Sequence, residues 1–167
     1  EAAAECDVKR FIFVSSLAVY GPGGDEFPCD ESAPLRPTTP YGHAKLRAEE
    51  LVLAYGARRA AHVCCLRPAS VYGPGAKGNL PRMARMISRG LFPPLPDVAN
   101  KRSMVHVDDL TAALCLAGES DAASGRSYNV TDGLAYSASE LQAIMCRAVG
   151  RPPPRLKIPL AAFSLLA

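Results

Sequence analysis

The sequence predicts an α/β fold built around a parallel β-sheet. Two short apolar runs, residues 9–15 and 61–68, are rich in β-branched and aromatic side chains or in small buried ones, as in strands that are covered on both faces. A helical segment, residues 41–59, lies between them. Of the 167 residues, 49% are hydrophobic and 21% are charged, which is typical of a folded domain or of part of a larger one.

The first strand is followed by a turn and then by the longest predicted helix. Residues 9–15 end at the pair Ser15-Ser16, and a polar, proline-rich loop at 30–37 leads to a helix that opens near Pro40. We expect one face of this helix to carry Arg47 and Glu50 in solvent. The opposite face is expected to be an apolar stripe of Ala44, Ala48, Leu51, Val52 and Tyr55.

Shorter elements complete the predicted order. In the second strand, residues 61–68, the neighbours Cys64 and Cys65 should point to opposite faces as buried, reduced thiols. A helix at 80–90 should end with Gly90 as its C-cap. A strand at 104–107 should lead to a helix at 110–117 capped by Asp108 or Asp109. After a strand at 128–130, the pattern Ser137-Ala-Ser-Glu140 predicts a capping box that opens a helix ending before Gly150.

The pentapeptide Val-Tyr-Gly-Pro-Gly occurs twice, at 19–23 and 71–75. Each copy follows a predicted buried strand, so we expect both loops at the carboxyl edge of one parallel sheet, where ligands bind in open α/β folds. The alternative is two unrelated Gly-Pro turns.

Tyr41 and Lys45 are four residues apart, which places them one turn apart on the same face of a helix. A positive charge beside a phenol favours loss of the phenolic proton. Ser16, placed alongside, could hydrogen-bond the same reacting oxygen, and the three together could move a proton on or off an alcohol. Alone, the Tyr-x-x-x-Lys spacing fits equally well an ordinary amphipathic helix with a lysine that reaches solvent.

Five sequence motifs, in order along the chain, accompany the Tyr41–Lys45 spacing. They are Val8-Lys-Arg-Phe-Ile-Phe-Val-Ser-Ser-Leu-Ala-Val-Tyr-Gly21, Pro40-Tyr-Gly-His-Ala-Lys45, Leu66-Arg-Pro-Ala-Ser-Val-Tyr-Gly-Pro-Gly75, Arg102-Ser-Met-Val-His-Val-Asp-Asp-Leu110 and Ser127-Tyr-Asn-Val-Thr-Asp-Gly133. Over nearly the whole chain the sequence resembles an extended short-chain dehydrogenase/reductase of the NAD-dependent epimerase/dehydratase family, most of all the UDP-glucose 4-epimerases. The resemblance implies the C-terminal part of a Rossmann-like parallel sheet (1–76) plus part of a smaller α/β substrate-binding domain (77–167), with 103–133 packing back on the first.

The resemblance also implies the site. Tyr41 would be the general acid/base, Lys45 would bond the nicotinamide-ribose hydroxyls, and Ser16 would position the reacting oxygen. Pro68 would line the nicotinamide side.

Two further residues would bind the substrate. Asn79 in Gly78-Asn-Leu-Pro81 and Arg102 would contact the diphosphate of a nucleotide sugar, Arg102 through its forked guanidinium. The alternative for Arg102 is a solvated loop arginine.

The resemblance leaves the reaction partly open. Related dehydratases carry Asp and Glu where this chain has Leu17 and Ala18, and related decarboxylases keep the Glu. We therefore expect NAD-dependent C4 epimerisation of a UDP-hexose through a transient 4-keto sugar. The alternatives are an NAD(P)-dependent reductase or dehydrogenase acting on a keto-sugar or other ketone, and a catalytically incompetent fragment.

The glycine-rich dinucleotide motif of the family is absent from the sequence, and we expect the chain to be a fragment that lacks the N-terminal glycine-rich half. NAD is the expected cofactor, with NADP left open because the residue that reads the ribose belongs to that half. A homodimer is expected for the full-length enzyme, in the cytoplasm.

The remaining composition argues for no other class. The net charge is +3, and Arg82, Arg85 and Arg89 at helical spacing favour a solvated face over a nucleic-acid groove. No apolar run reaches transmembrane length, and no histidine pair or Cys-x-x-Cys has metal-ligand spacing, so neither a membrane nor a metal is expected.

Overall fold

The computed structural model describes residues 5–22, 29–76, 79–96 and 100–154. They form two compact units. The first contains the described residues up to Ala69 together with Asp108–Thr131, and the second contains Ser70–Val107 together with the described residues from Asp132 onward. The functional assignment of 1–76 to cofactor binding and 77–167 to substrate binding stays a prediction.

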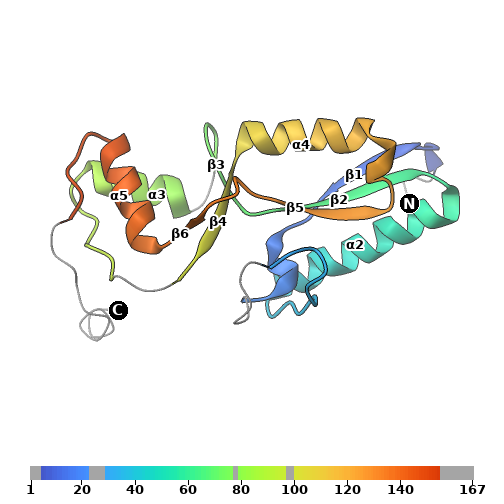
Figure 1. The fold of residues 1–167 in the computed structure, drawn as a ribbon, viewed down its shortest axis with the longest axis horizontal. Helices are drawn as coiled ribbons and strands as arrows, with labels where there is room; N and C mark the ends of the chain where they lie inside the picture. Colours follow the sequence, from blue (N-terminus) through green and yellow to red (C-terminus); the bar gives the residue numbers. More distant parts are fainter. Residues whose placement is uncertain (1–4, 23–28, 77–78, 97–99, 155–167) are drawn as a thin grey trace. The chain divides into compact units, whose positions relative to one another are not determined.

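The first unit is a three-layer α/β sandwich. Its sheet consists of β1 (Arg10–Val14), β2 (His62–Pro68) and β5 (Arg126–Val130), all parallel, in the order β1-β2-β5. The helices α2 (Pro40–Arg59) and α4 (Val107–Glu119) lie on opposite faces of the sheet (Figure 1). The short 3-10 helix η2 (Asp121–Ala123) precedes β5. The predicted α/β class with a parallel sheet is confirmed.

Side chains along the central strand β2 alternate between the two helices. Cys64 and Leu66 pack in a core cluster with Ala117 on α4 and Ala123. Val63 lies on the other face, where its side chain occupies the space that a Cβ at Gly56 of α2 would need. Because strand side chains alternate, Cys65 shares the face of Val63. Both cysteines are fully buried, as predicted.

Helix α2 begins and ends at recognisable caps. The Thr39 hydroxyl accepts a hydrogen bond from the Gly42 amide at 3.1 Å, and Pro40 occupies the first turn, where its missing N–H is no loss. The helix ends at Ala60, which has φ +49°.

The predicted apolar stripe of α2 is wrong at Ala44 and Leu51, whereas Ala48, Val52 and Tyr55 are half-buried. The residues that α2 buries are Gly42, Glu49 and Gly56, whereas Ala44 is exposed and Leu51 is 55% exposed. The two glycines let the helix backbone approach its neighbours closely, which large apolar side chains would prevent. Glu49 lies seven residues from each glycine, about two helical turns, so its charged side chain is on the same face.

Between β1 and α2 lies the 3-10 helix η1 (Leu17–Tyr20), which Ser16 caps by accepting a hydrogen bond from the Ala18 amide at 3.2 Å. Gly21 follows with φ +84°. The first copy of the repeated pentapeptide therefore continues from the carboxyl end of β1, although its Gly23 lies outside the described residues.

The second unit has a small sheet of its own. Strand β3 (Ser70–Tyr72) pairs parallel with β4 (Arg102–His106), and β4 pairs antiparallel with β6 (Ala135–Tyr136). The helices α3 (Asn79–Ser88) and α5 (Ala138–Ala148) pack against each other (Figure 1). The two copies of the pentapeptide come soon after β1 and β2, which are neighbouring parallel strands, so the expectation that both follow strands of one sheet is confirmed; that Val71 and Tyr72 of the second copy themselves lie in β3 was not expected.

Two of the predicted helix caps are present, and a third is not. The Ser137 hydroxyl accepts from the Glu140 amide while the Glu140 carboxylate accepts from the Ser137 amide, the predicted capping box. Gly90, with φ +74°, ends α3 as expected. Helix α4 begins at Val107, so Asp108 lies in its first turn and does not cap it, and its charge there complements the helix dipole.

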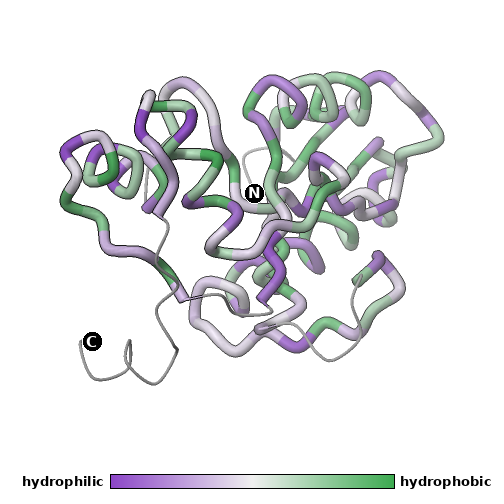
Figure 2. Tube along the Cα trace, turned by 60° about the vertical axis from the view of Figure 1, so that its left-hand side comes forward, coloured by the Kyte–Doolittle hydropathy of each residue, from purple (hydrophilic) through white to green (hydrophobic). Residues whose placement is uncertain are grey.

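Coloured by hydropathy, the helical coils change between hydrophilic and hydrophobic residues at short intervals (Figure 2). Within the described part of the chain, no helix is both long enough and apolar enough to cross a bilayer.

Candidate active site

Tyr41 and Lys45 lie in the first half of α2, with the lysine against the carboxyl end of β1. The Lys45 ammonium donates to the Val14 carbonyl at 2.9 Å and lies 5.0 Å from the Phe13 ring centre. It is 5.7 Å from the centre of the Tyr41 ring. Tyr41 is 57% exposed, so its phenol is open to a ligand. An ammonium has three N–H donors, and the bond to Val14 leaves donors that can reach ligand hydroxyls.

Ser16 stands between β1 and η1, two residues after the carbonyl that Lys45 contacts. Its hydroxyl accepts the capping bond from Ala18, which leaves the hydroxyl hydrogen able to donate. The neighbouring Ser15 differs, because its side chain is buried and, within the described residues, its hydroxyl has no hydrogen-bond partner.

A glycine between the two α2 residues brings η1 close to the helix. A Cβ built on Gly42 would lie 2.6 Å from the Ala18 carbonyl oxygen and 3.0 Å from the Pro37 side chain. Only glycine therefore allows η1 to pack on α2 at this distance. Gly42 thus allows η1, which Ser16 caps, to pack against the beginning of α2, which carries Tyr41 and Lys45.

These residues fit the nicotinamide end of a dinucleotide. An exposed phenol and an ammonium with remaining donors flank the carboxyl end of a parallel strand, the edge at which such ligands bind. Pro68 ends the neighbouring strand β2 and is buried there. The glycine-rich turn that would hold the pyrophosphate is not in this sequence.

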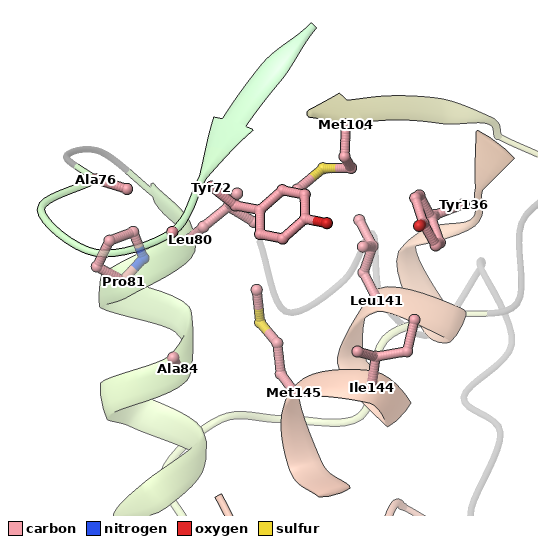
Figure 3. A pocket seen from close by; sticks show the side chains of 11 residues that line it. Tyr72, Ala76, Leu80, Pro81, Ala84, Met104, Tyr136, Leu141, Ile144 and Met145 are labelled. Carbon is pink, nitrogen blue, oxygen red and sulfur yellow. The ribbon is translucent and has the colours of Figure 1, made fainter. Parts of the chain in front are cut away.

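The second unit contains a cavity of about 380 Å³ with mostly apolar walls. Figure 3 shows Met145 and the Tyr72 ring reaching into the space between α3 and α5. The Tyr136 hydroxyl donates to Asp132 at 2.8 Å, and this bond raises the pKa of Tyr136 to about 12. The other walls include Leu80, Pro81, Ala84, Met104, Leu141 and Ile144.

The two predicted diphosphate-binding residues are neighbours of this lining. Asn79 is the first residue of α3 and is followed by Leu80, which lines the cavity. Arg102 begins β4 and is exposed, opposite Tyr136 in the strand pairing. Met104, two residues along β4, lies on the same strand face as Arg102 and also lines the cavity. Gly78, which belongs to the predicted Asn79 motif, lies outside the described residues.

Sequence reasoning missed a buried charged pair beside the site, Glu49 and Arg67. The Arg67 guanidinium contacts the Glu49 carboxylate at 2.7 Å, and both side chains are almost completely buried. A signal was present, because Arg67 interrupts an otherwise apolar strand, and a charge inside a covered strand needs a partner. In the described ranges, no group of three acidic, cysteine or histidine side chains is arranged to hold a metal ion.

Several known proteins are similar to this chain over most of its length. A UDP-glucose 4-epimerase of Vibrio cholerae is 31% identical over 167 residues, which cover 98% of this chain and 50% of that protein. Short-chain dehydrogenase/reductase family 42E member 1 of Homo sapiens is 32% identical over 170 residues, covering 92% of this chain and 43% of its own length. The solved structure of MoeE5 in complex with UDP-glucose and NAD is 34% identical, with a TM-score of 0.78, over 91% of this chain and 52% of that one.

The chain thus spans about half the length of the relatives it matches. The model of the NAD dependent epimerase/dehydratase family matches residues 1–131. With a parallel α/β unit, the Tyr41–Lys45 pair at the end of β1 and a family match over most of its length, this chain belongs to the NAD dependent epimerase/dehydratase family.

Proposed function

We propose that the protein containing this chain is an NAD-dependent nucleotide-sugar epimerase that inverts C4 of a UDP-hexose through a transient 4-keto sugar. The observation that carries the proposal is the exposed Tyr41 phenol beside the Lys45 ammonium, with the Ser16 turn packed against the same stretch of α2. The UDP-glucose 4-epimerase relative and the UDP-glucose complex of MoeE5 support this class of substrate.

The proposed chemistry assigns one task to each side chain. Tyr41 takes the proton from the C4 hydroxyl as the sugar is oxidised and returns it when the sugar is reduced. Lys45 is proposed to bind the nicotinamide-ribose hydroxyls, and Ser16 donates a hydrogen bond that orients the reacting oxygen. Bound NAD would accept a hydride and give it back, so that no cofactor is consumed. Asn79 and Arg102 are proposed to hold the diphosphate.

The absence of carboxylates in η1 separates epimerisation from elimination. Residues Leu17 and Ala18 open this short helix, whose first turn contains no acidic residue. Loss of water from a sugar needs an acid and a base at neighbouring carbons. Because neither side chain can carry a proton, η1 offers no group for that step, which favours the reaction that needs only Ser16, Tyr41 and Lys45.

A second candidate is an NAD(P)-dependent reductase or dehydrogenase acting on a keto-sugar or other ketone. The apolar lining of the cavity in the second unit favours it, since such walls suit a ligand of low polarity. The human relative, named a dehydrogenase/reductase, is consistent with it as well. The same Ser16, Tyr41 and Lys45 would serve, but the cofactor would be consumed.

The two candidates are separated by following the sugar and the cofactor in one assay. The natural protein that contains this chain is incubated with UDP-galactose and, separately, UDP-N-acetylgalactosamine, while ¹H NMR follows the anomeric signals and absorbance follows NADH. We expect the C4 epimer without net NADH. Consumption of cofactor in proportion to a ketone substrate would instead establish the second candidate, and no interconversion of any UDP-hexose would reject the first.

Variants on one helix then test the site. Tyr41→Phe should lower kcat by about 10²- to 10⁴-fold, because it removes the acid/base group. Tyr55→Phe is a matched control, since Tyr55 lies on the same helix and its hydroxyl bonds the Val8 carbonyl at 3.0 Å instead of a ligand. Equal activity of the two variants would remove Tyr41 from the mechanism.

The 167-residue chain by itself is proposed to be catalytically incompetent, because it has no glycine-rich turn for the pyrophosphate. Calorimetric titration of the isolated chain with NAD should show no tight binding. A strong, saturable heat signal would contradict this.

A further inference from the structure

We propose that Arg67 is a positioning residue, which through Tyr20 and Glu49 holds the turn of Ser16 in register with the helix of Tyr41 and Lys45. This inference rests on the proposed use of Ser16, Tyr41 and Lys45 in one reaction. It concerns side chains that touch neither substrate nor cofactor in the proposed mechanism.

The first observation is the geometry of the buried pair. Arg67 Nη2 donates to Glu49 Oε2 at 2.7 Å, and Arg67 Nε lies 3.0 Å from Oε1 and 3.2 Å from Oε2. The residues are 5% and 2% exposed. Burying two charges costs about as much free energy as their attraction returns, so a pair of this kind is weak evidence of a role in stability alone. Its forked geometry fixes both direction and distance between β2 and α2.

The second observation is a branch from the same guanidinium to η1. Arg67 Nη1 donates to the Tyr20 hydroxyl at 2.6 Å, and the guanidinium lies 5.1 Å from the centre of the Tyr20 ring. The Tyr20 hydroxyl in turn donates to Asn129 Oδ1 at 2.9 Å. Burial raises the pKa of Tyr20 despite the bond from Arg67, so the phenol keeps the proton that it donates.

The third observation is where these contacts fall relative to the proposed site. Glu49 follows Lys45 by four residues on α2, one turn along the helix. Tyr20 ends the short helix η1 that begins with the Ser16 cap. Arg67 therefore contacts both elements that carry the proposed reacting groups, at Tyr20, four residues after Ser16, and at Glu49, four residues after Lys45.

The fourth observation is how little room the two elements have to move. A Cβ on Gly42 would meet the Ala18 carbonyl, so η1 and α2 touch through their backbones. The Arg67 bonds reach Tyr20, at the end of η1 away from Ser16, and Glu49, seven residues after Gly42 on α2. Loss of the Tyr20 branch would let η1 tilt about this backbone contact and move Ser16 relative to Tyr41.

The network also extends to the loop after η1. The Asn129 amide N–H donates to Glu31 Oε1 at 2.7 Å, and the Asn129 side-chain amide donates to the Cys29 carbonyl at 3.4 Å. The loop that leads into α2 is thereby tied to β5. Both chain segments that flank the predicted site are thus attached to one set of polar contacts.

The decisive variant is Tyr20→Phe, because it removes the branch to η1 and leaves the Glu49–Arg67 pair intact. We expect kcat of the natural protein to fall by about 10- to 100-fold with KM changed less than about threefold, since misplacement by about 1 Å can cost as much as 10²-fold in rate. Tyr55→Phe also removes one hydroxyl bonded inside this unit and should leave kcat within about twofold. Both variants are assayed well below their unfolding temperatures.

A second measurement does not depend on turnover. Tyr41 is replaced by 3-fluorotyrosine, and its ¹⁹F resonance is recorded in the otherwise unaltered protein, in Tyr20→Phe and in Tyr55→Phe. We expect the resonance to move or broaden in Tyr20→Phe only, because a purely structural loss would affect both variants alike. An unchanged resonance in Tyr20→Phe, or a kcat within about twofold of the unaltered protein, would overturn the positioning role. If the unaltered protein epimerises no UDP-hexose, the proposed function fails while the ¹⁹F comparison still decides this one.

Discussion

The two copies of Val-Tyr-Gly-Pro in this chain fold into different structures. In the first copy, Val19 and Tyr20 belong to the 3-10 helix η1, and the tyrosine hydroxyl is bonded between Arg67 and Asn129. In the second, Val71 and Tyr72 belong to strand β3, and the tyrosine ring lines an apolar cavity. The same four residues thus take their conformation from the surrounding structure.

The surroundings explain the difference. The first copy follows a side chain, Ser16, that caps a helical turn, and it meets a buried guanidinium that satisfies the tyrosine hydroxyl. The second copy lies beside β4, whose residues Met104–His106 pair with it in parallel. Backbone pairing and burial of polar groups each outweigh the weak conformational preference of the four residues themselves.

The largest expected effect comes from replacing Glu49, the buried carboxylate that pairs with Arg67. Arg67 in turn bonds Tyr20 of the first copy. Glu49→Ala should lower the free energy of unfolding by about 3–5 kcal/mol, because it leaves the buried Arg67 charge unpaired. Glu50→Ala is the matched control, since its ion pair with Arg47 at 2.9 Å is exposed and should contribute about 1 kcal/mol at most. Urea unfolding of both variants measures the difference. A similar loss of stability in Glu49→Ala and Glu50→Ala would show that burial of the Glu49–Arg67 pair has no energetic consequence.

A smaller effect distinguishes two glycines at different places in the pentapeptide, Gly21 in third position of the first copy and Gly75 in last position of the second. A Cβ on Gly21, which has φ +84°, would collide with the Arg36 carbonyl oxygen, whereas a Cβ on Gly75, with φ +76°, meets nothing within 4 Å. Gly21→Ala should therefore cost about 2–3 kcal/mol and Gly75→Ala about 1 kcal/mol, the second from backbone strain alone. Thermal unfolding followed by circular dichroism checks both. A larger loss for Gly75→Ala would contradict the assignment of the tighter turn to the first copy.

The smallest effect concerns the tyrosine hydroxyls. Tyr20→Phe removes the hydroxyl that bonds Arg67 Nη1 and Asn129 Oδ1 in a partly buried place and should cost about 1–2 kcal/mol. Tyr72→Phe, at the wall of an open cavity, should change stability by less than about 0.5 kcal/mol. The test is the urea concentration at the midpoint of unfolding, compared between variants whose unfolding free energy depends equally on urea. Equal shifts of the midpoint in Tyr20→Phe and Tyr72→Phe would mean that the two hydroxyls have equivalent surroundings.

Local sequence predicted the elements whose signals are local. The strands β1 and β2 and the helix α2 begin and end within about two residues of expectation, because apolar runs, prolines and caps act over one turn or one strand. The Ser137–Glu140 capping box was predicted for the same reason. The Tyr41–Lys45 pair was found because helical spacing alone places the two side chains together.

Features that depend on distant partners were not predicted. The face that α2 buries carries Glu49, which apolar periodicity cannot identify, since Glu49 is buried only because Arg67 comes from a strand eighteen residues later. The sequence places the second pentapeptide after β2 but does not predict that Val71 and Tyr72 form a strand, because nothing in these residues reveals that β4 will pair with them. The cavity of the second unit needs side chains from β3, β4, β6, α3 and α5, which no short window of sequence contains.

The division of the first unit into two stretches of sequence has a practical consequence. The polypeptide passes from one unit to the other after Ala69, after Val107 and after Thr131. A laboratory that wished to graft the cavity of a relative onto this scaffold would have to transplant two separate inserts and preserve three junctions. A cut after Val107 would divide both units, whereas a cut after Ala69 or after Thr131 would keep one unit whole but leave it joined to part of the other, so no single cut yields two complete and separate units.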